Sequence, residues 1–139
     1  MILLDPQTAD DLVVALADGP DALVGELNRL ILALPGVRTV TWLAAVPEQK
    51  ITRRIYIDKL PIIGNSPAEM AVYIPETADL EKLGYYSTLC MPIVIAGETR
   101  GTVNLLGDAG IFTPDLLSAL NTLLPIAALI FVFEDLGTR

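Results

Sequence analysis

The sequence predicts an α+β domain in which a central antiparallel sheet is flanked by the N- and C-terminal helices on one face and by loops and short helices on the other. Three patterns indicate this class: helical apolar spacing near both ends, apolar strand-like runs joined by short turns, and an irregular middle segment. The length of 139 residues suits one domain. We expect a single domain over 1–139, with a helical extension at 1–19 and a core at 20–135.

Two helices are expected at the N-terminal end. Residues 7–18 form the first, with Thr8 as a possible cap and Gly19 as the stop, and Pro20 suits the first position of the second helix. Leucines recur at intervals of four, three and four along the second helix, which predicts one buried stripe: Leu23, Leu27, Leu30 and Leu34.

The apolar period then changes to two. Residues 37–46 are rich in Val and Thr and contain Trp42, which predicts a strand. Residues 47–50 read as a turn and residues 51–57 as a second strand. We expect the two strands to form an antiparallel hairpin.

The middle segment contains short helices. Ser66-Pro-Ala-Glu69 matches a capping box with proline at the first helical position, although a short strand at 71–74 is a competing interpretation. Residues 77–83 predict another short helix that Gly84 ends.

A second hairpin and a long helix complete the chain. Residues 86–95 and 99–106 are apolar at nearly every position, and the turn Ala96-Gly-Glu98 joins them, so we expect strands covered on both faces. Thr113-Pro-Asp115 begins a helix that reaches about residue 135, and Pro125 should kink it.

Charge and composition exclude several classes of protein. The net charge of −8 disfavours binding to a nucleic-acid backbone. Residues 116–133 carry no charge and approach the length of a membrane span, but Asp115, Ser118 and Thr122 form a polar stripe, so a buried or interfacial helix is favoured over a membrane span. The N-terminus lacks a basic region, and together with the lone cysteine this favours a cytoplasmic protein.

The chain has no histidine and one cysteine, Cys90. Catalytic triads and zinc or haem sites that use histidine are therefore excluded, and one cysteine cannot make an intrachain disulfide. No catalytic residue, metal site or cofactor is predicted. Cys90 lies in an apolar strand, where a buried, inert thiol is favoured over a reactive one.

Two segments carry a resemblance to a known family. Ser87–Gly107 resembles the signature hairpin of GAF domains, in which an apolar-Pro-apolar strand precedes a turn glycine and a Gly-x-apolar-x-apolar strand. Phe112-Thr-Pro-Asp followed by a Leu/Ala-rich helix resembles the usual ending of these domains, and Arg53-Arg-Ile-Tyr56 is similar to a strand of small stand-alone bacterial members. The resemblance implies a GAF-like sheet and a ligand pocket between this sheet and residues 59–86.

Some chemistries of that family do not fit this chain. Bilin-binding members use histidine, cyclic-nucleotide members carry an Asn-Lys-Phe-Asp-Glu type motif, and the sulfoxide reductases need several cysteines; this chain lacks all three features. The resemblance therefore implies a sensor-like module of unidentified ligand.

Six residues are candidate ligand contacts: Arg53, Tyr56, Tyr85, Tyr86, Asn104 and Trp42. Arg53 could bind an anion, but an ion pair or a solvated head group is favoured, and Arg54 is expected in water. The aromatic residues, Tyr73 included, more often belong to a core; Tyr85 and Tyr86 are preferred because they follow Gly84 near the expected pocket mouth. A structural hydrogen bond is favoured for Asn104.

The resemblance also implies dimerisation through terminal helices, and residues 126–133 are apolar all round. Six residues are candidates for a homodimer interface: Leu23, Leu27, Ile126, Leu129, Ile130 and Phe133.

Three functions follow in order of preference. The first is a non-enzymatic sensory or regulatory domain in which a small molecule orders residues 59–86 and alters the helical dimer surface. The second is a ligand-free homodimerisation or protein-interaction module. The third is a cysteine-dependent redox enzyme.

Overall fold

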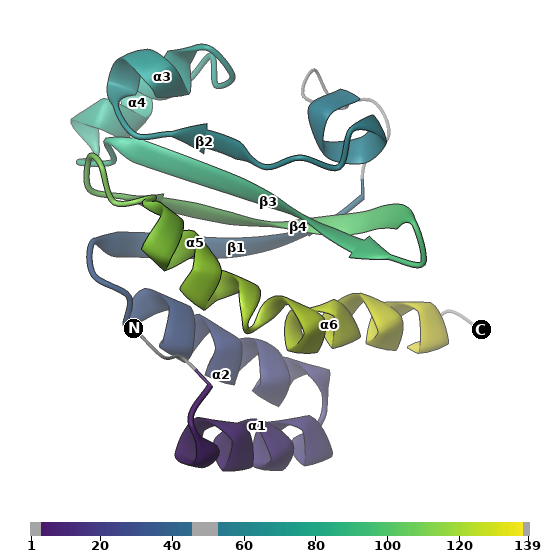
Figure 1. Cartoon of the computed structure of the whole chain (residues 1–139). Helices are drawn as coiled ribbons and strands as arrows, with labels where there is room; N and C mark the ends of the chain where they lie inside the picture. The colour runs from purple at the N-terminus through teal and green to yellow at the C-terminus, as the bar shows by residue number, and fades with distance from the viewer. Residues whose placement is uncertain (1–3, 46–52, 138–139) are drawn as a thin grey trace. The chain divides into compact units, whose positions relative to one another are not determined.

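The computed structural model describes residues 4–45 and 53–137 and divides into two compact units. The helical unit consists of Met1–Leu34 and Pro114–Arg139, and the sheet unit consists of Pro35–Thr113. Figure 1 labels their helices and strands. Each unit is described below by itself.

The helical unit begins with α1 (Pro6–Asp18) and α2 (Pro20–Leu32), as predicted. The cap of α1 is Asp5, whose Oδ1 accepts a 2.7 Å hydrogen bond from the backbone N–H of Thr8, so the assignment of Thr8 as the cap was wrong. An aspartate suits this place because its carboxylate accepts from orphan N–H groups at the helix start. Gly19 ends α1 with a φ of 120°.

The leucine stripe of α2 is buried, as its spacing predicts. Leu23, Leu27 and Ile31 have no exposed surface, and Leu34 just after the helix is 3% exposed. This stripe packs inside the chain.

The predicted long C-terminal helix consists of two helices, α5 (Pro114–Asn121) and α6 (Leu124–Gly137), bent by 49°. At the break the Thr122 hydroxyl donates to the Ala119 carbonyl at 2.7 Å, and Pro125 follows without an N–H of its own. The helix is therefore interrupted between Asn121 and Leu124, where the sequence predicts only a kink at Pro125. Within the described residues no single helix is long and apolar enough to cross a membrane, whereas α5 and α6 taken together as a bent pair have sufficient length and apolarity.

The sheet unit contains four antiparallel strands in the order β1-β4-β3-β2. Their bounds are β1 (Val37–Ala44), β2 (Ile62–Gly64), β3 (Ser87–Ile95) and β4 (Glu98–Gly107). The predicted β3–β4 hairpin is confirmed, and its turn residues Ala96 and Gly97 have φ values of 50° and 83°. Positive φ at both positions matches the turn that suits the right-handed twist of a hairpin.

The predicted strand at 51–57 is wrong over its described part. Residues Arg53–Ile57 form a π-helical turn, η1, in which the N–H of Asp58 donates to the Arg53 carbonyl at 2.9 Å. Ile55 is fully buried, and its carbonyl accepts a 2.9 Å bond from the Thr99 hydroxyl on β4. Tertiary packing of one isoleucine thus overrides the alternating pattern.

The hairpin expected between 37–46 and 51–57 is therefore not formed by the described residues, in which β1 pairs with β4. The predicted turn at 47–50 lies outside the described residues. Strand β2, which the sequence analysis missed, pairs instead with β3.

Two short helices follow β2: α3 (Pro67–Ala71) and α4 (Thr77–Lys82). The predicted capping box is confirmed, because the Ser66 hydroxyl accepts from the N–H of Glu69 at 3.2 Å. The competing strand at 71–74 is wrong. A Cβ added at Gly64 would lie 2.9 Å from the backbone nitrogen of Met70, so the absence of a side chain lets α3 pack directly on β2.

Candidate functional site

One face of the sheet carries a row of four side chains, one from each strand. In the strand register Thr41 of β1 lies opposite Asn104 of β4, Asn104 lies opposite Cys90 of β3, and Cys90 lies opposite Ile62 of β2. Because side chains alternate along a strand, these four residues point to the same face. Thr88 and Leu106 lie on this face in the neighbouring row.

This face, the connection between α3 and α4, and α4 enclose a cavity of about 200 Å³, which we call the inner cavity. Its lining residues are Thr41, Ile62, Tyr73, Ile74, Leu80, Thr88, Cys90, Asn104, Leu105 and Leu106. None of them is a charged residue. The inner cavity is therefore suited to an apolar group with a few hydrogen-bonding atoms.

The polar atoms of the inner cavity come mainly from the central row. The Asn104 amide donates to the Thr102 hydroxyl at 3.0 Å, and its amide oxygen accepts no hydrogen bond from the described part of the chain. The Thr41 hydroxyl donates to the backbone carbonyl of Asn104 at 3.5 Å. The Asn104 amide oxygen is thus an available acceptor beside the cavity.

Cys90 contributes a buried thiol to the same cavity. Burial raises the pKa of this thiol to about 11, although its hydrogen bond with Thr102 lowers it in part. A thiol with this pKa is protonated at neutral pH and is a poor nucleophile. The side chain therefore serves the cavity as a small apolar surface, as the sequence analysis favoured.

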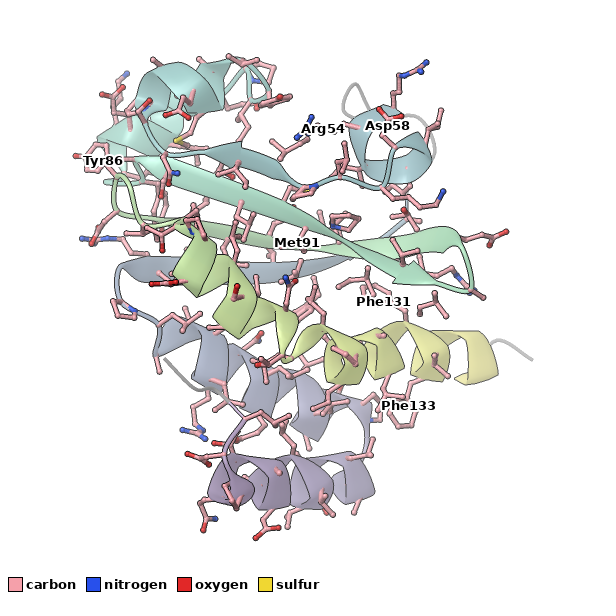
Figure 2. All side chains as sticks on the ribbon, viewed as in Figure 1. Arg54, Asp58, Tyr86, Met91, Phe131 and Phe133 are labelled. Atoms are coloured by element: carbon pink, nitrogen blue, oxygen red, sulfur yellow. The ribbon has the colours of Figure 1, made fainter. Side chains whose placement is uncertain are left out.

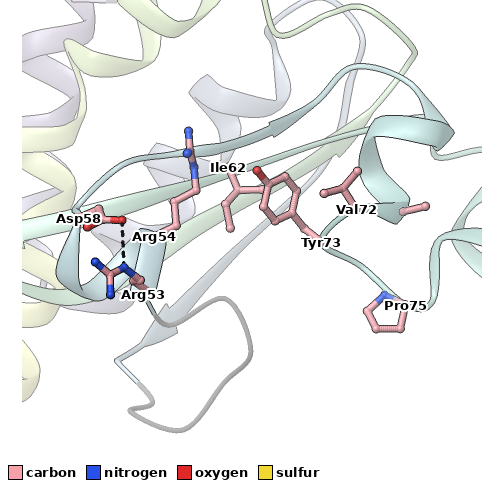
Figure 3. Close-up of a pocket in the computed structure, with 8 residues that line it drawn as sticks. Arg53, Arg54, Asp58, Ile62, Val72, Tyr73 and Pro75 are labelled. Atoms are coloured by element: carbon pink, nitrogen blue, oxygen red, sulfur yellow. Dashed lines mark ion pairs between the residues drawn. The ribbon is translucent and has the colours of Figure 1, made fainter.

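A second cavity of about 410 Å³ lies between η1 and the segment that follows α3, and we call it the outer cleft. Its lining residues are Arg53, Arg54, Asp58, Ile62, Ala71, Val72, Tyr73 and Pro75. Figure 3 shows Arg53, Arg54 and Asp58 on one side, Val72 and Pro75 on the other, and Ile62 and Tyr73 between them. The outer cleft differs from the inner cavity in carrying three charged groups.

The charged groups of the outer cleft are only loosely paired. Arg53 Nε lies 3.9 Å from Asp58 Oδ2, and the Arg53 side chain is 81% exposed. Arg54 Nε donates to the Pro61 carbonyl at 2.7 Å, which fixes the position of its guanidinium group. The terminal amino groups of Arg54 make no hydrogen bond within the described residues.

Ile62 and Tyr73 line both spaces, and we call them the shared wall. Ile62 forms a buried cluster with Ile55 and Cys90, and Tyr73 packs against this cluster. The same cluster holds η1 in place, because Ile55 is its buried residue. The two cavities are therefore neighbours within the sheet unit, separated by two side chains.

The structure brings together only some of the predicted ligand contacts. Arg53 lines the outer cleft and Asn104 lines the inner cavity. Tyr56 packs against the buried cluster beside the cavities. Trp42 lies opposite Val103, on the other face of the sheet from Asn104, and lines neither cavity.

Tyr85 and Tyr86, the preferred aromatic candidates, lie elsewhere. Figure 2 shows Tyr86 at the opposite end of the sheet from Arg54 and Asp58. The pKa of Arg38 is raised, mainly by its 2.6 Å hydrogen bond to Asp108 and to a smaller extent by Tyr85 and Tyr86. The two tyrosines therefore belong to the surroundings of the Arg38–Asp108 ion pair.

Sequence reasoning missed other lining residues. Tyr73 is an aromatic residue that the sequence did not favour as a ligand contact, and Arg54, which is exposed as expected, also lines the outer cleft. Tyr73 lies two residues after α3, the helix that the capping box predicts, so the predicted position of this helix could have indicated that Tyr73 lies beside the sheet. Ile62 belongs to a three-residue strand, which is too short for a visible alternation.

The predicted interface residues all lie in the helical unit. Leu23 and Leu27 are fully buried within the chain and Ile130 is 7% exposed, so these three offer almost no surface to a partner. Ile126 and Leu129 are partly exposed and line an apolar groove of about 220 Å³. The remaining lining residues are Leu4, Ala9, Leu12, Val13 and Leu16. Phe133 is also partly exposed.

The described residues contain no group of three or more Cys, Asp or Glu side chains placed to hold a metal ion. Among the described residues that line the two cavities, the polar side chains supply two guanidinium groups, one carboxylate, several hydroxyl groups, one thiol and one amide beside apolar surface.

Comparison with known proteins identifies the fold. Neither a family model nor a curated protein matches the sequence. The structure is similar to the crystal structure of the GAF domain region of a protein from Geobacter sulfurreducens PCA that is described as a membrane protein. The TM-score is 0.64 at 16% sequence identity, and the match covers 86% of this chain and 97% of the other. The chain therefore has the predicted GAF-like α+β fold.

Proposed function

We propose that the chain is a sensory or regulatory domain that binds a small molecule without chemical conversion, in the inner cavity and the adjoining outer cleft. One observation carries the proposal: two hollows on the same face of the sheet share Ile62 and Tyr73. Concave sites with apolar walls and few polar atoms are typical of small-molecule binding. The GAF-like fold supports a sensory or regulatory role.

Binding rather than catalysis is supported by the chemistry of the lining residues. The thiol of Cys90 has a pKa of about 11, so it is not activated for attack. Among the described residues that line the two cavities, Asp58 is the only carboxylate. General acid–base chemistry with paired carboxylates therefore lacks a second group there.

The test is a thermal-shift screen of a metabolite and fragment library with a blocked variant. Leu80→Trp enlarges a partly exposed residue that lines the inner cavity, whereas Leu83→Trp enlarges a residue that is 70% exposed just after the same helix. A ligand of the cavity should raise the melting temperature of the wild type and of Leu83→Trp but not of Leu80→Trp. The proposal fails if no compound raises it, or if every active compound acts equally on Leu80→Trp.

A second candidate function is a homodimerisation module. It is favoured by the apolar groove of the helical unit and by Val13, which lines the groove and is 66% exposed. Exposed apolar surface of this kind is typical of protein-protein contacts. A second copy of the chain is the proposed partner, through α1 together with Ile126 and Leu129.

Sedimentation velocity tests this candidate. The wild type should sediment as a dimer at micromolar concentration, and Val13→Glu should sediment as a monomer because a charge enters the apolar contact. Leu83→Glu, at an equally exposed position in the sheet unit, should leave the dimer intact. A monomeric wild type contradicts the dimer and leaves the ligand proposal standing.

A further inference from the structure

We infer that the ligand is an organic monocarboxylate with an apolar body, whose carboxylate binds Arg54 in the outer cleft while its body passes the shared wall into the inner cavity. This inference rests on the proposed function and specifies the chemical class of its ligand. It is drawn from the unequal distribution of charge between the two neighbouring cavities.

The outer cleft offers a positive site of low net charge. Arg53 and Arg54 are opposed by one carboxylate, Asp58, so the three groups sum to one positive charge in a chain with a net charge of −8. One positive charge matches a monoanion better than a dianion or a cation. The cleft is therefore expected to select a singly charged acid.

Arg54 is the residue best placed to bind the acid. Its Nε is occupied by the Pro61 carbonyl at 2.7 Å, and this bond fixes the plane of the guanidinium group. Its two terminal amino groups make no hydrogen bond within the described residues and can donate in parallel to two carboxylate oxygens. Arg53 is 81% exposed and shares Asp58, so it adds charge rather than a fixed contact.

The inner cavity requires the other end of the ligand to be uncharged. The described residues that line it include no acid and no base. A charged group placed there would lose its hydration without gaining a counter-charge. Ile74, Leu80 and Leu106 suit an apolar body, and the free amide oxygen of Asn104 can accept one hydrogen bond from it.

Because the two cavities share Ile62 and Tyr73, one ligand can place its carboxylate in the outer cleft and its uncharged body in the inner cavity. Ile62 is 2% exposed and Tyr73 is half-buried beside it, so the ring of Tyr73 is the main surface that a ligand meets between the two cavities. An aryl or alkyl chain between the carboxylate and the buried end fits this order of surfaces.

The experiment compares three probes with the same phenylpropyl skeleton by isothermal titration calorimetry on the full chain: 3-phenylpropanoate, its isosteric amide 3-phenylpropanamide, and 3-phenylpropylamine. The acid should bind the wild type at least about ten-fold more tightly than the amide, since a charge-assisted pair with Arg54 is lost in the amide. The amine should bind most weakly.

Two arginine variants locate the effect. Arg54→Gln should remove the difference between acid and amide, and Arg54→Lys, which keeps the charge but loses the planar donor pair, should retain part of it. Arg38→Gln is the matched control, because Arg38 is an exposed arginine paired with Asp108 outside both cavities. It should bind all three probes as the wild type does.

The outcomes separate this inference from the proposed function. Equal binding of acid and amide, blocked in both cases by Leu80→Trp, overturns the carboxylate inference and retains the cavity as a ligand site. No binding of any probe, while compounds of the screen still act in a Leu80-dependent way, also overturns the inference alone. Failure of both experiments overturns both.

Discussion

The inner cavity and the outer cleft share two residues but are built from different kinds of structure. The central row of the inner cavity comes from four hydrogen-bonded strands, so its positions are fixed by the register Thr41–Asn104–Cys90–Ile62. The charged side of the outer cleft comes from one short π-helical turn, and Arg53 there is 81% exposed. Side chains fixed by a sheet can discriminate shape, whereas exposed charges on a short turn discriminate mainly by sign and are weakened by salt.

The largest expected effect on stability comes from truncating Ile62, a residue of the shared wall between the inner cavity and the outer cleft. Ile62→Ala deletes buried carbon atoms from the cluster with Ile55 and Cys90, and we expect the free energy of unfolding to fall by about 2–5 kcal/mol. Ile57→Ala is the control, because Ile57 is 60% exposed on the neighbouring η1 and its truncation should cost less than about 0.5 kcal/mol. Urea unfolding measures both. Equal losses would contradict the assignment of Ile62 as the shared structural wall.

A second change disturbs the packing of α3, whose last residue Ala71 lines the outer cleft, on β2. Gly64→Ala places a Cβ 2.9 Å from the backbone nitrogen of Met70 and 3.0 Å from its Cα, so α3 must move away from β2. We expect a loss of about 1–3 kcal/mol in the free energy of unfolding. Gly25→Ala, in α2 where an added Cβ meets nothing within 4 Å, should be neutral or stabilising. Thermal unfolding of both variants checks this, and an unchanged stability of Gly64→Ala would show that α3 is not held against β2.

A third prediction uses pH to measure the burial of the cavity thiol. The pKa of Cys90 is raised from 9.0 to about 11, so between these values the unfolded chain releases a proton that the folded chain retains. Stability from the protonated thiol is therefore complete below about pH 9 and is lost as the pH rises toward 11. Relative to Cys90→Ala, the wild type should lose about 1.4 kcal/mol between neutral pH and pH 10. Parallel pH dependence of the two proteins in urea unfolding would mean that the thiol is solvated.

The contrast between the two cavities also explains what sequence patterns could predict. The β3–β4 hairpin was predictable because its strands are continuous apolar runs joined by Ala96-Gly97, a turn whose geometry is local. Asn104 was identified as a polar residue in an apolar strand, and its partner positions Thr41 and Cys90 followed only from the register. Local rules thus predicted β1, β3 and β4, whereas the site depends on pairing between distant segments.

The outer cleft was less predictable for the same reason. Residues 51–57 alternate like a strand, yet the described part turns into η1 because Ile55 packs with Ile62 and Cys90 and bonds to Thr99. The contacts of Ile55 with Cys90 and Thr99 join residues that are far apart in the sequence, and no local propensity encodes them. The alternation placed Arg53 and Arg54 on opposite faces of a strand, whereas the π-helical turn places both beside one cleft.

The smallest expected effect is in the charge balance of the outer cleft. Asp58→Asn removes the carboxylate that lies 3.9 Å from Arg53 and raises the net charge of the cleft by one. Because the Arg53 side chain is 81% exposed and the Asp58 side chain 42% exposed, stability should change by less than about 0.5 kcal/mol.

The affinity for 3-phenylpropanoate should nevertheless rise by up to about five-fold in Asp58→Asn, since two unit charges about 4 Å apart in water interact with about 1 kcal/mol and a longer separation gives less. The gain should shrink in high salt, because exposed charges are screened. The affinity for 3-phenylpropanamide should stay unchanged, and calorimetry on both probes at two salt concentrations measures the difference. If the affinity for the amide rose as much as the affinity for the acid, the substitution would be acting through the shape of the cleft. The interpretation that the outer cleft selects by charge and the inner cavity by shape would then be wrong.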